Sequence, residues 1–168
     1  ICTPPADHRA HVEAALRAGK DVIAEKPLVG SVRQVDELAA ISAETGRHVM
    51  PIFQYRFGNG LQRLKALVDQ GLAGRHYVTN IDLAWLRGAD YYAVPWRGRW
   101  DTELGGVLTT HAVHLLDMAV HVLGPPVAVF ARTSTLVNPI DTEDCAAVVL
   151  RWADGSLATL SATLGSQV

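Results

Sequence analysis

The stretch Gly105–Gly124, GGVLTTHAVHLLDMAVHVLG, is the one around which the rest of the chain is organised. Its spacing predicts a single helix, on which four polar side chains fall within a stripe about 60° wide at roughly 100° per residue. The remaining surface is almost entirely apolar, which is typical of a buried helix. Buried polar groups must be paired or face a cavity, so this stripe is the first candidate for chemistry. It consists of Thr110, His114, Asp117 and His121.

The composition excludes several classes of partner. The chain has 168 residues, 49% hydrophobic and 19% charged, and a formal net charge of −2. The absence of a basic surplus argues against nucleic acid and anionic membranes as partners. Its longest apolar run is too short to cross a bilayer. Cys2 and Cys145 lack the spacing of a redox or metal motif, which predicts reduced thiols and a cytoplasmic protein.

Residues 1–53 alternate between short strands and helices. Gly19 and Gly46 are predicted to end the two helices, and Asp7 and Ser31 to cap their N-termini. This alternation predicts an α/β unit with a parallel sheet, whose ligands bind beyond the carboxyl ends of the strands. We expect strands at 1–3, 21–25 and 48–53, and helices at 6–18 and 32–45.

Residues 54–168 change to an α+β pattern, so we expect a domain boundary near 53–57. A helix at 59–70, a strand at 76–86 and a Trp-, Tyr- and Arg-rich loop at 87–101 precede the Gly105–Gly124 helix. Strands at 127–137, 146–152 and 156–164 follow it, the last two joined by a turn at 153–155. The predicted domains are therefore 1–53 and 54–168.

Three segments together resemble one family. They are TPPADHRAHVEAALRAGKDVIAEKPL at 3–28, QYRF at 54–57 and GGVLTTHAVHLLD at 105–117. They resemble the Gfo/Idh/MocA oxidoreductases, the family of glucose–fructose oxidoreductase and inositol dehydrogenase. The resemblance implies the C-terminal half of a Rossmann domain, followed by an α/β domain with an open mixed sheet. It also implies NAD or NADP as cofactor and hydride transfer to or from a sugar, polyol or sugar-acid alcohol.

The family's glycine-rich phosphate loop has no counterpart in the sequence. We therefore expect the chain to be an internal piece of a longer protein, and expect the piece alone to bind dinucleotide poorly. The residue that distinguishes NAD from NADP would lie in the same missing part.

The resemblance assigns three catalytic positions. Lys26, held in place by Pro27, would reach the substrate oxygen and stabilise a developing alkoxide. His114 would exchange the hydroxyl proton, because imidazole titrates near neutral pH. Thr110 stands where many members carry an Asp. Its hydroxyl can hold a substrate oxygen or water, but cannot relay a proton as a carboxylate can.

The remaining site predictions surround these three residues. Asp117, one helical turn from His114 and His121, could orient either imidazole or form local hydrogen bonds within the helix packing. No metal is expected, because one ion could reach only part of the stripe. Tyr92, Trp100 and His111 are predicted to contact the substrate, with Lys26 and His114, and Tyr91 and Arg99 are further candidates on the same side. The predicted cofactor contacts are Thr3, Pro4, Pro5, His8, Glu25, Lys26, Pro27, Gln54, Arg56, Trp96 and Arg97.

Two other functions stay open at this point. Some relatives keep their cofactor bound and use transient oxidation for elimination or glycoside cleavage. A dinucleotide-binding regulator without catalysis is also compatible with Thr110. In each case the open apolar sheet face predicts a homo-oligomer.

Overall fold

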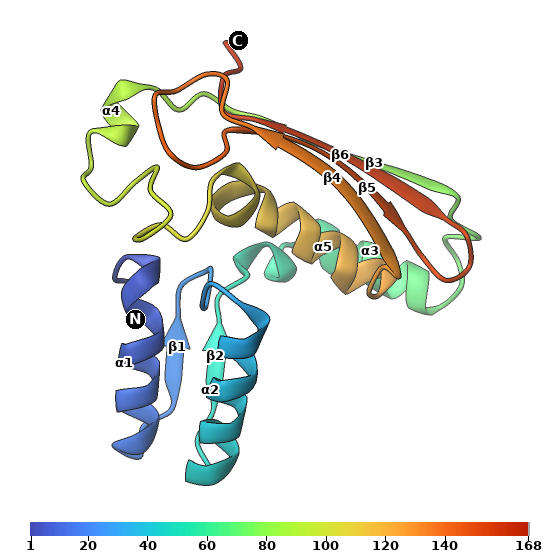
Figure 1. The fold of residues 1–168 in the computed structure, drawn as a ribbon. Coiled ribbons are helices and arrows are strands. Elements are labelled where there is room, and N and C mark those ends of the chain that lie inside the picture. The colour runs from blue at the N-terminus through green and yellow to red at the C-terminus, as the bar shows by residue number, and fades with distance from the viewer. Residues whose placement is uncertain (168) are drawn as a thin grey trace.

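The computed structural model describes residues 1–167 and has two parts (Figure 1). In the first, strands β1 (Val22–Ala24) and β2 (Val49–Pro51) pair in parallel, and helices α1 (Pro5–Arg17) and α2 (Val32–Thr45) pack against them. The predicted strand at the N-terminus is too short to be a regular strand. Ile1 nevertheless accepts a hydrogen bond from the Glu25 amide at 3.0 Å and so extends this pairing.

The ends of these two helices follow from their sequence. Ser31 caps α2, accepting from the Gln34 amide at 3.3 Å, and Gly46 ends it in the left-handed conformation, both as predicted. The predicted Asp7 cap of α1 is wrong. The helix begins earlier, at Pro5, because the fixed φ of proline suits the first helical turn.

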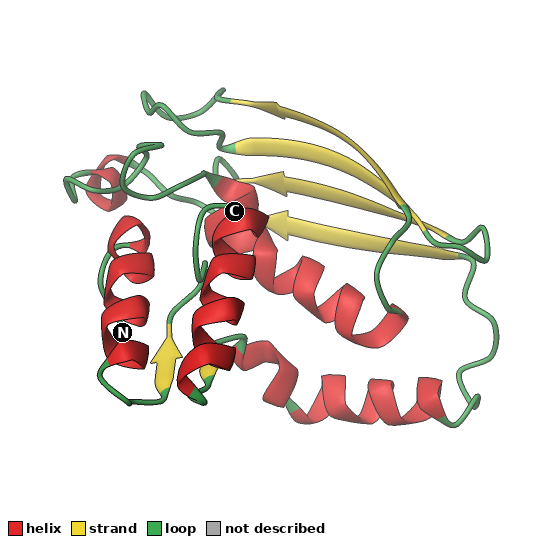
Figure 2. Cartoon of the chain, turned by 60° about the horizontal axis from the view of Figure 1, so that its bottom comes forward, coloured by secondary structure: helices red, strands yellow, loops and turns green. Residues whose placement is uncertain are grey.

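The second part is a four-stranded mixed sheet of β3 (Val78–Ala84), β4 (Ala128–Ser134), β5 (Cys145–Arg151) and β6 (Leu157–Thr163). The strands lie in the order β3-β6-β5-β4. Strand β6 pairs parallel with β3 and antiparallel with β5, which is antiparallel to β4. Helix α3 (Asn59–Asp69) and the helix from the central stretch lie beneath the sheet (Figures 1 and 2). The mixed sheet was predicted.

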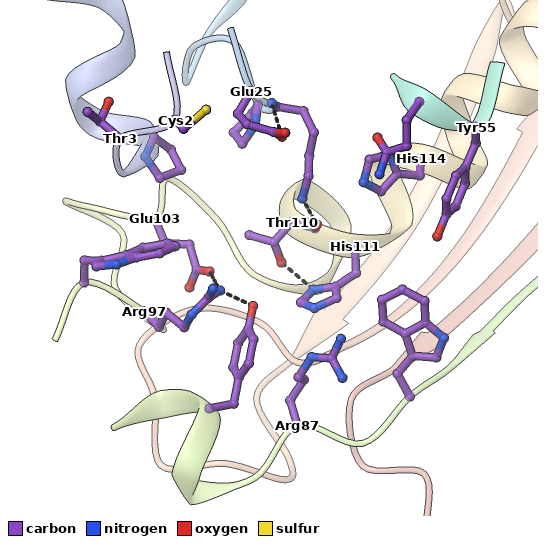
Figure 3. A pocket seen from close by; sticks show the side chains of 17 residues that line it. Cys2, Thr3, Glu25, Tyr55, Arg87, Arg97, Glu103, Thr110, His111 and His114 are labelled. Atoms are coloured by element: carbon purple, nitrogen blue, oxygen red, sulfur yellow. Dashed lines mark hydrogen bonds and ion pairs between the residues drawn. The ribbon is translucent and has the colours of Figure 1, made fainter. Parts of the chain in front are cut away.

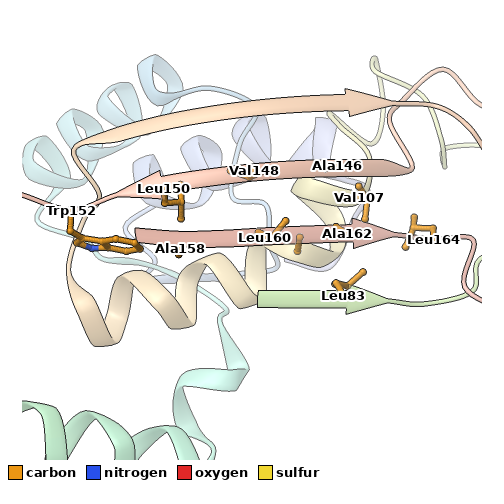
Figure 4. Packing of buried hydrophobic residues seen from close by; sticks show 11 residues of the cluster. Leu83, Val107, Ala146, Val148, Leu150, Trp152, Ala158, Leu160, Ala162 and Leu164 are labelled. Atoms are coloured by element: carbon orange, nitrogen blue, oxygen red, sulfur yellow. The ribbon is translucent and has the colours of Figure 1, made fainter. Parts of the chain in front are cut away.

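The core of this part lies on the helix-facing side of the sheet (Figure 4). Alternate residues of β5 and β6 are buried there, as a strand period of two requires. Leu160 is 2% exposed and Val107 is fully buried, and each such side chain stabilises the fold by about 1.5–3 kcal/mol. Trp152 also donates from its indole to the Gly124 carbonyl at 2.9 Å, which ties β5 to the end of the central helix.

The central stretch differs from the single regular helix that was predicted. It contains a π-helical turn, η2 (Leu108–Ala112), before the α-helix α5 (Val113–Leu123). Residues from Gly105 to Ala112 are largely buried, whereas most of α5 is only half-buried. The expectation of a helix buried along its whole length is therefore wrong for α5, and the buried end is the one that carries Thr110 and His114.

The loop at 87–101 includes a single helical turn, α4 (Ala89–Tyr92), and the 3₁₀ turn η1 (Gln54–Phe57) follows β2. Both were predicted as irregular chain. Within residues 1–167, no helix combines the length and apolar character needed to cross a membrane.

Candidate active site

A cavity of about 450 Å³ lies where the carboxyl ends of β1 and β2 meet η2 (Figure 3). Its position agrees with the rule that ligands bind beyond the carboxyl ends of parallel strands. Side chains from both parts of the molecule line it. They are Cys2, Thr3, Pro5, Glu25, Lys26, Pro27, Gln54, Tyr55, Trp85, Arg87, Tyr91, Trp96, Arg97, Glu103, Thr110, His111 and His114.

Lys26 bridges the two parts of the chain. It follows β1, and its Nζ donates a hydrogen bond to the backbone carbonyl of Thr110 in η2. Burial lowers the pKa of the Lys26 ammonium, and the Glu25 carboxylate partly offsets this effect. The side chain is thus held at the cavity with its charge only partly neutralised by the protein.

His114 lies at the start of α5 and is 6% exposed. Its ring packs against Tyr55, with 4.9 Å between the ring centroids. Burial lowers the pKa of His114, and the Lys26 charge acts in the same direction. Within residues 1–167, its Nδ1 has no hydrogen-bond partner. A neutral imidazole with an unpaired buried nitrogen is suited to a ligand hydroxyl.

The Thr110 hydroxyl determines which ring nitrogen of His111 carries the proton. Its hydroxyl lies 2.7 Å from the Gly106 carbonyl, which can only accept, so the hydroxyl proton points there. The hydroxyl oxygen, 2.6 Å from His111 Nδ1, must then accept the N–H of His111. Burial, with the charges of Arg87, Lys26 and Arg97, lowers the pKa of His111 to about 3. The neutral ring therefore carries an unprotonated Nε2.

Glu143 holds the start of η2 in place. Its carboxylate accepts from the amides of Gly106 at 3.0 Å and Leu108 at 3.1 Å, and its backbone carbonyl accepts from the Val107 amide at 2.8 Å. A Cβ atom on Gly106 would lie 1.7 Å from the Glu143 oxygen. Glycine at this position therefore permits the close approach that sets the position of Thr110 and His111.

Arg97 and Glu103 form the opposite wall of the cavity. The Arg97 guanidinium lies 3.9 Å from the Tyr91 ring centroid and 4.3 Å from that of Trp96, and pairs with Glu103 at 3.3 Å. Burial raises the pKa of Glu103, and the hydrogen bond from the Gly98 amide partly offsets this. The charge of Arg97 is therefore largely balanced by the protein itself.

Most of the predicted site residues meet at this cavity. From the predicted cofactor set, Thr3, Pro5, Glu25, Lys26, Pro27, Gln54, Trp96 and Arg97 line it, and so do the predicted substrate and catalytic residues Tyr91, His111, Thr110 and His114.

His8 and Pro4, two of the predicted cofactor residues, lie outside the cavity lining. His8 is 1% exposed and positions the loops, with its ring nitrogens 2.8 Å from the Pro27 carbonyl and 2.9 Å from the Thr3 carbonyl. Pro4 is the N-terminal boundary residue of α1. His8 therefore acts on the cavity through the two loops that it contacts.

Arg56 and Asp117 form an ion pair with each other. Arg56 Nε donates to Asp117 at 2.7 Å. This carboxylate therefore binds a guanidinium on η1 and orients neither His114 nor His121. Arg56 lies outside the cavity lining, and its contact with the cofactor stays a prediction.

Three predicted substrate residues also lie outside the cavity lining. Tyr92 packs against the core of the second part. Trp100 donates from its indole to the Asp141 carbonyl at 2.9 Å. Arg99 is paired with Asp101 at 3.0 Å. Each of these side chains is therefore engaged within the second part of the protein.

Several lining residues were not predicted as site residues, namely Cys2, Tyr55, Trp85, Arg87 and Glu103. Tyr55 lies between Gln54 and Arg56 at a predicted strand end, and this position could have indicated that Tyr55 lines the cavity. Arg87 directly follows the predicted strand at 76–86. For Glu103, a buried carboxylate beside a glycine-rich helix start, the sequence offers no local signal.

No metal site is visible in the part of the chain that the structure describes, where no group of three or more His, Cys, Asp or Glu side chains is arranged to hold an ion. The ligand set that the sequence offers on the central stripe is His114, Asp117 and His121, and Asp117 is engaged by Arg56.

A Rossmann-type unit, a mixed sheet and a cavity lined by a lysine and a histidine between them are typical of dinucleotide-dependent oxidoreductases. The model of the oxidoreductase family with an NAD-binding Rossmann fold matches residues 1–53, and that of the GFO/IDH/MocA C-terminal domain matches residues 61–168. The chain belongs to the Gfo/Idh/MocA oxidoreductase family, as the sequence predicted.

Individual relatives agree with this assignment. The chain is 33% identical to D-glucoside 3-dehydrogenase of Escherichia coli over 129 residues, which are 75% of this chain and 35% of that protein. It is 30% identical to myo-inositol 2-dehydrogenase of Thermotoga maritima, over 95% of this chain and 47% of that protein. The WlbA dehydrogenase of Chromobacterium violaceum, solved with NADH and UDP-GlcNAcA, superposes with a TM-score of 0.93 at 30% identity, over 98% of this chain and 48% of that one. The chain thus spans about half the length of its relatives or less.

Proposed function

We propose that the protein transfers a hydride between NAD or NADP and an alcohol carbon of a sugar, polyol or sugar acid. The observation that carries this proposal is the meeting of Lys26 and His114 at one cavity, at the carboxyl ends of parallel strands. The unpaired Nδ1 of His114 is the feature that a ligand hydroxyl would satisfy. The family's dehydrogenase relatives support the same reaction class.

In this proposal the nicotinamide supplies or takes the hydride, and the protein's residues manage the proton and charge. His114 takes the hydroxyl proton, since burial keeps its imidazole neutral by lowering its pKa. The Lys26 ammonium stabilises the alkoxide that forms. Thr110 keeps the Nε2 of His111 available as an acceptor for a second substrate hydroxyl. On the cofactor side we assign Thr3, Pro5, Glu25, Pro27 and Gln54.

A panel assay tests the reaction. The full-length protein is incubated with NAD or NADP and a set of sugars, polyols and sugar acids, and reduced cofactor is followed by absorbance. We expect net reduction with at least one alcohol. Turnover of substrate without net change in reduced cofactor would instead favour transient oxidation. Binding of cofactor without any turnover would favour a regulator.

We also propose that the outer sheet face is a homo-oligomer interface in a cytoplasmic protein. This face presents Phe130, Val149 and Leu157, which are 60%, 43% and 42% exposed. Apolar faces of this kind commonly mark protein interfaces. Sedimentation of the full-length protein, with Val149→Glu as the disrupting variant, tests it: we expect the variant to dissociate, and an unchanged mass would contradict the interface.

A further inference from the structure

Arg87 is fixed at the edge of the cavity by its surroundings. Its backbone amide donates to the Leu164 carbonyl at 2.8 Å, just beyond the end of β6. The guanidinium lies 4.9 Å from the Trp85 ring centroid and 5.1 Å from that of Tyr91. Stacking on two aromatic rings limits the conformations of this long side chain, so its planar set of donors is preorganised. In Figure 3 the guanidinium points toward the His111 ring.

The Arg87 guanidinium lacks the carboxylate partner that Arg56 and Arg97 each have within residues 1–167. Arg56 pairs with Asp117 and Arg97 with Glu103, but Arg87 forms no ion pair within residues 1–167. Its Nη1 donates to the backbone carbonyl of Leu86 at 2.9 Å, and the guanidinium also acts on the Tyr91 hydroxyl through a hydrogen bond. Its buried Nε has no acceptor in the same part of the chain. A buried donor without an acceptor is destabilising, so this position is suited to an acceptor from a ligand.

The charge around His111 is also unbalanced. Lys26, Arg87 and Arg97 each lower the pKa of the ring, so all three cations are close enough to act on it. Glu103 balances Arg97, and Glu25 acts on Lys26. Arg87 therefore contributes the positive charge at this end of the cavity for which the described chain supplies no carboxylate.

We propose that Arg87 binds the carboxylate of an acidic sugar, such as a uronic or aldonic acid, while an alcohol of the same molecule meets Lys26 and His114. This rests on the proposed function and narrows its substrate class. The donors of a planar guanidinium match the two oxygens of a carboxylate, and the Arg87 Nε has no acceptor within residues 1–167. The cavity of about 450 Å³ lies within the usual range of small-molecule sites.

Equilibrium binding tests the inference without relying on turnover. Calorimetry on the full-length protein saturated with reduced cofactor compares D-glucuronate and D-gluconate with D-glucose, sorbitol and D-glucose 6-phosphate. We expect at least one acid to bind about tenfold to a hundredfold more tightly than its neutral counterpart, the range of a charge-assisted hydrogen bond. Equal binding of acid and neutral sugar, or tightest binding of the phosphate, would overturn the inference.

Variants of Arg87 then test whether this residue causes the preference for the acid over the neutral sugar. Arg87→Met keeps an unbranched side chain that can stack on the rings but removes the charge, and it should abolish the preference for the acid. Arg87→Lys keeps the charge without the planar donors, and it should retain part of the preference even if the Met variant does not fold. Arg99→Met is the matched control, because Arg99 is paired with Asp101 outside the cavity lining. A full preference in both Arg87 variants would overturn the assignment.

These experiments distinguish failure of the carboxylate site from failure of the proposed hydride transfer. An Arg87-dependent preference for acids in a protein without hydride transfer would support the carboxylate site and contradict the reaction. Hydride transfer to sugars without any preference for acids would support the reaction and overturn the carboxylate site.

Discussion

Lys26 Nζ donates a hydrogen bond to the backbone carbonyl of Thr110, so a strand-end lysine of the Rossmann-type unit is tied directly to the π-helical turn of the second part. Single π-helical turns are rare and occur frequently at functional sites. Here η2 and the first turn of α5 place Thr110, His111 and His114 against the ends of β1 and β2. The architecture of the site thus depends on a local departure from regular helix geometry.

Thr110→Val should destabilise the fold by about 1–3 kcal/mol, because it leaves the His111 Nδ1–H buried without an acceptor. Urea unfolding measures this change, and ¹⁵N chemical shifts of the imidazole report the tautomer. Thr110→Ser retains the hydroxyl and should restore both. A valine variant with wild-type stability and an unchanged tautomer would contradict the role assigned to the hydroxyl.

Gly106→Ala should be strongly destabilising, by about 1–3 kcal/mol or more, because its Cβ would clash with the Glu143 backbone at 1.7 Å. Gly60→Ala is the matched control. Gly60 lies in α3 with open space where a Cβ would be, so this change should be neutral or stabilising by up to about 1 kcal/mol. Thermal unfolding distinguishes the two, and equal effects would contradict the close approach.

Acid should destabilise the fold through His111. Its pKa is about 3 in the folded state, below the ordinary value of 6.5, so the unfolded chain binds more protons between these pH values. Stability contributed by the neutral ring is present above pH 6.5 and is lost as the pH falls toward 3, by at most about 1.4 kcal/mol per pH unit.

His111→Gln should therefore flatten the dependence of the urea midpoint on pH between about 7.5 and 5. His48→Gln, at an exposed position, is measured in parallel as a comparison variant. If both variants retained the wild-type slope, burial of a neutral His111 would not be the source.

Replacing Arg56 and replacing Asp117 should lower the free energy of unfolding by unequal amounts. The Asp117 side chain is 10% exposed and that of Arg56 is 40% exposed. Arg56→Met leaves a buried carboxylate uncompensated and should cost about 1–3 kcal/mol, whereas Asp117→Asn leaves an arginine that reaches water and should cost less. A double-mutant cycle measures both, and a larger cost for Asp117→Asn would contradict this order.

Periodicity and turn chemistry were sufficient to predict most of the fold. Ser31, Gly46 and the alternation in β5 and β6 encode local structure directly. The π-helical turn could not be predicted, because it depends on Glu143, a residue distant in sequence that binds the amides of Gly106 and Leu108.

Part of the candidate site could likewise be predicted from the sequence. Strand ends bring Lys26 and Gln54 to one edge of a parallel sheet, and motif spacing indicates His114. The pairing of Arg56 with Asp117 depends on tertiary packing, as does the choice between two adjacent tyrosines for the one that lines the cavity. The unpaired Nε of Arg87 likewise becomes apparent only when its neighbours are known.

The central claim is that Lys26 and His114 act together in hydride transfer, and stopped-flow absorbance of the nicotinamide in the full-length protein tests it most directly. Lys26→Met and His114→Asn should each slow the hydride-transfer step about 100-fold to 10,000-fold, because each removes charge stabilisation or proton transfer from the reacting alcohol. Lys20→Met, at an exposed position just after α1, should leave the rate unchanged. Wild-type rates in both site variants would contradict the account.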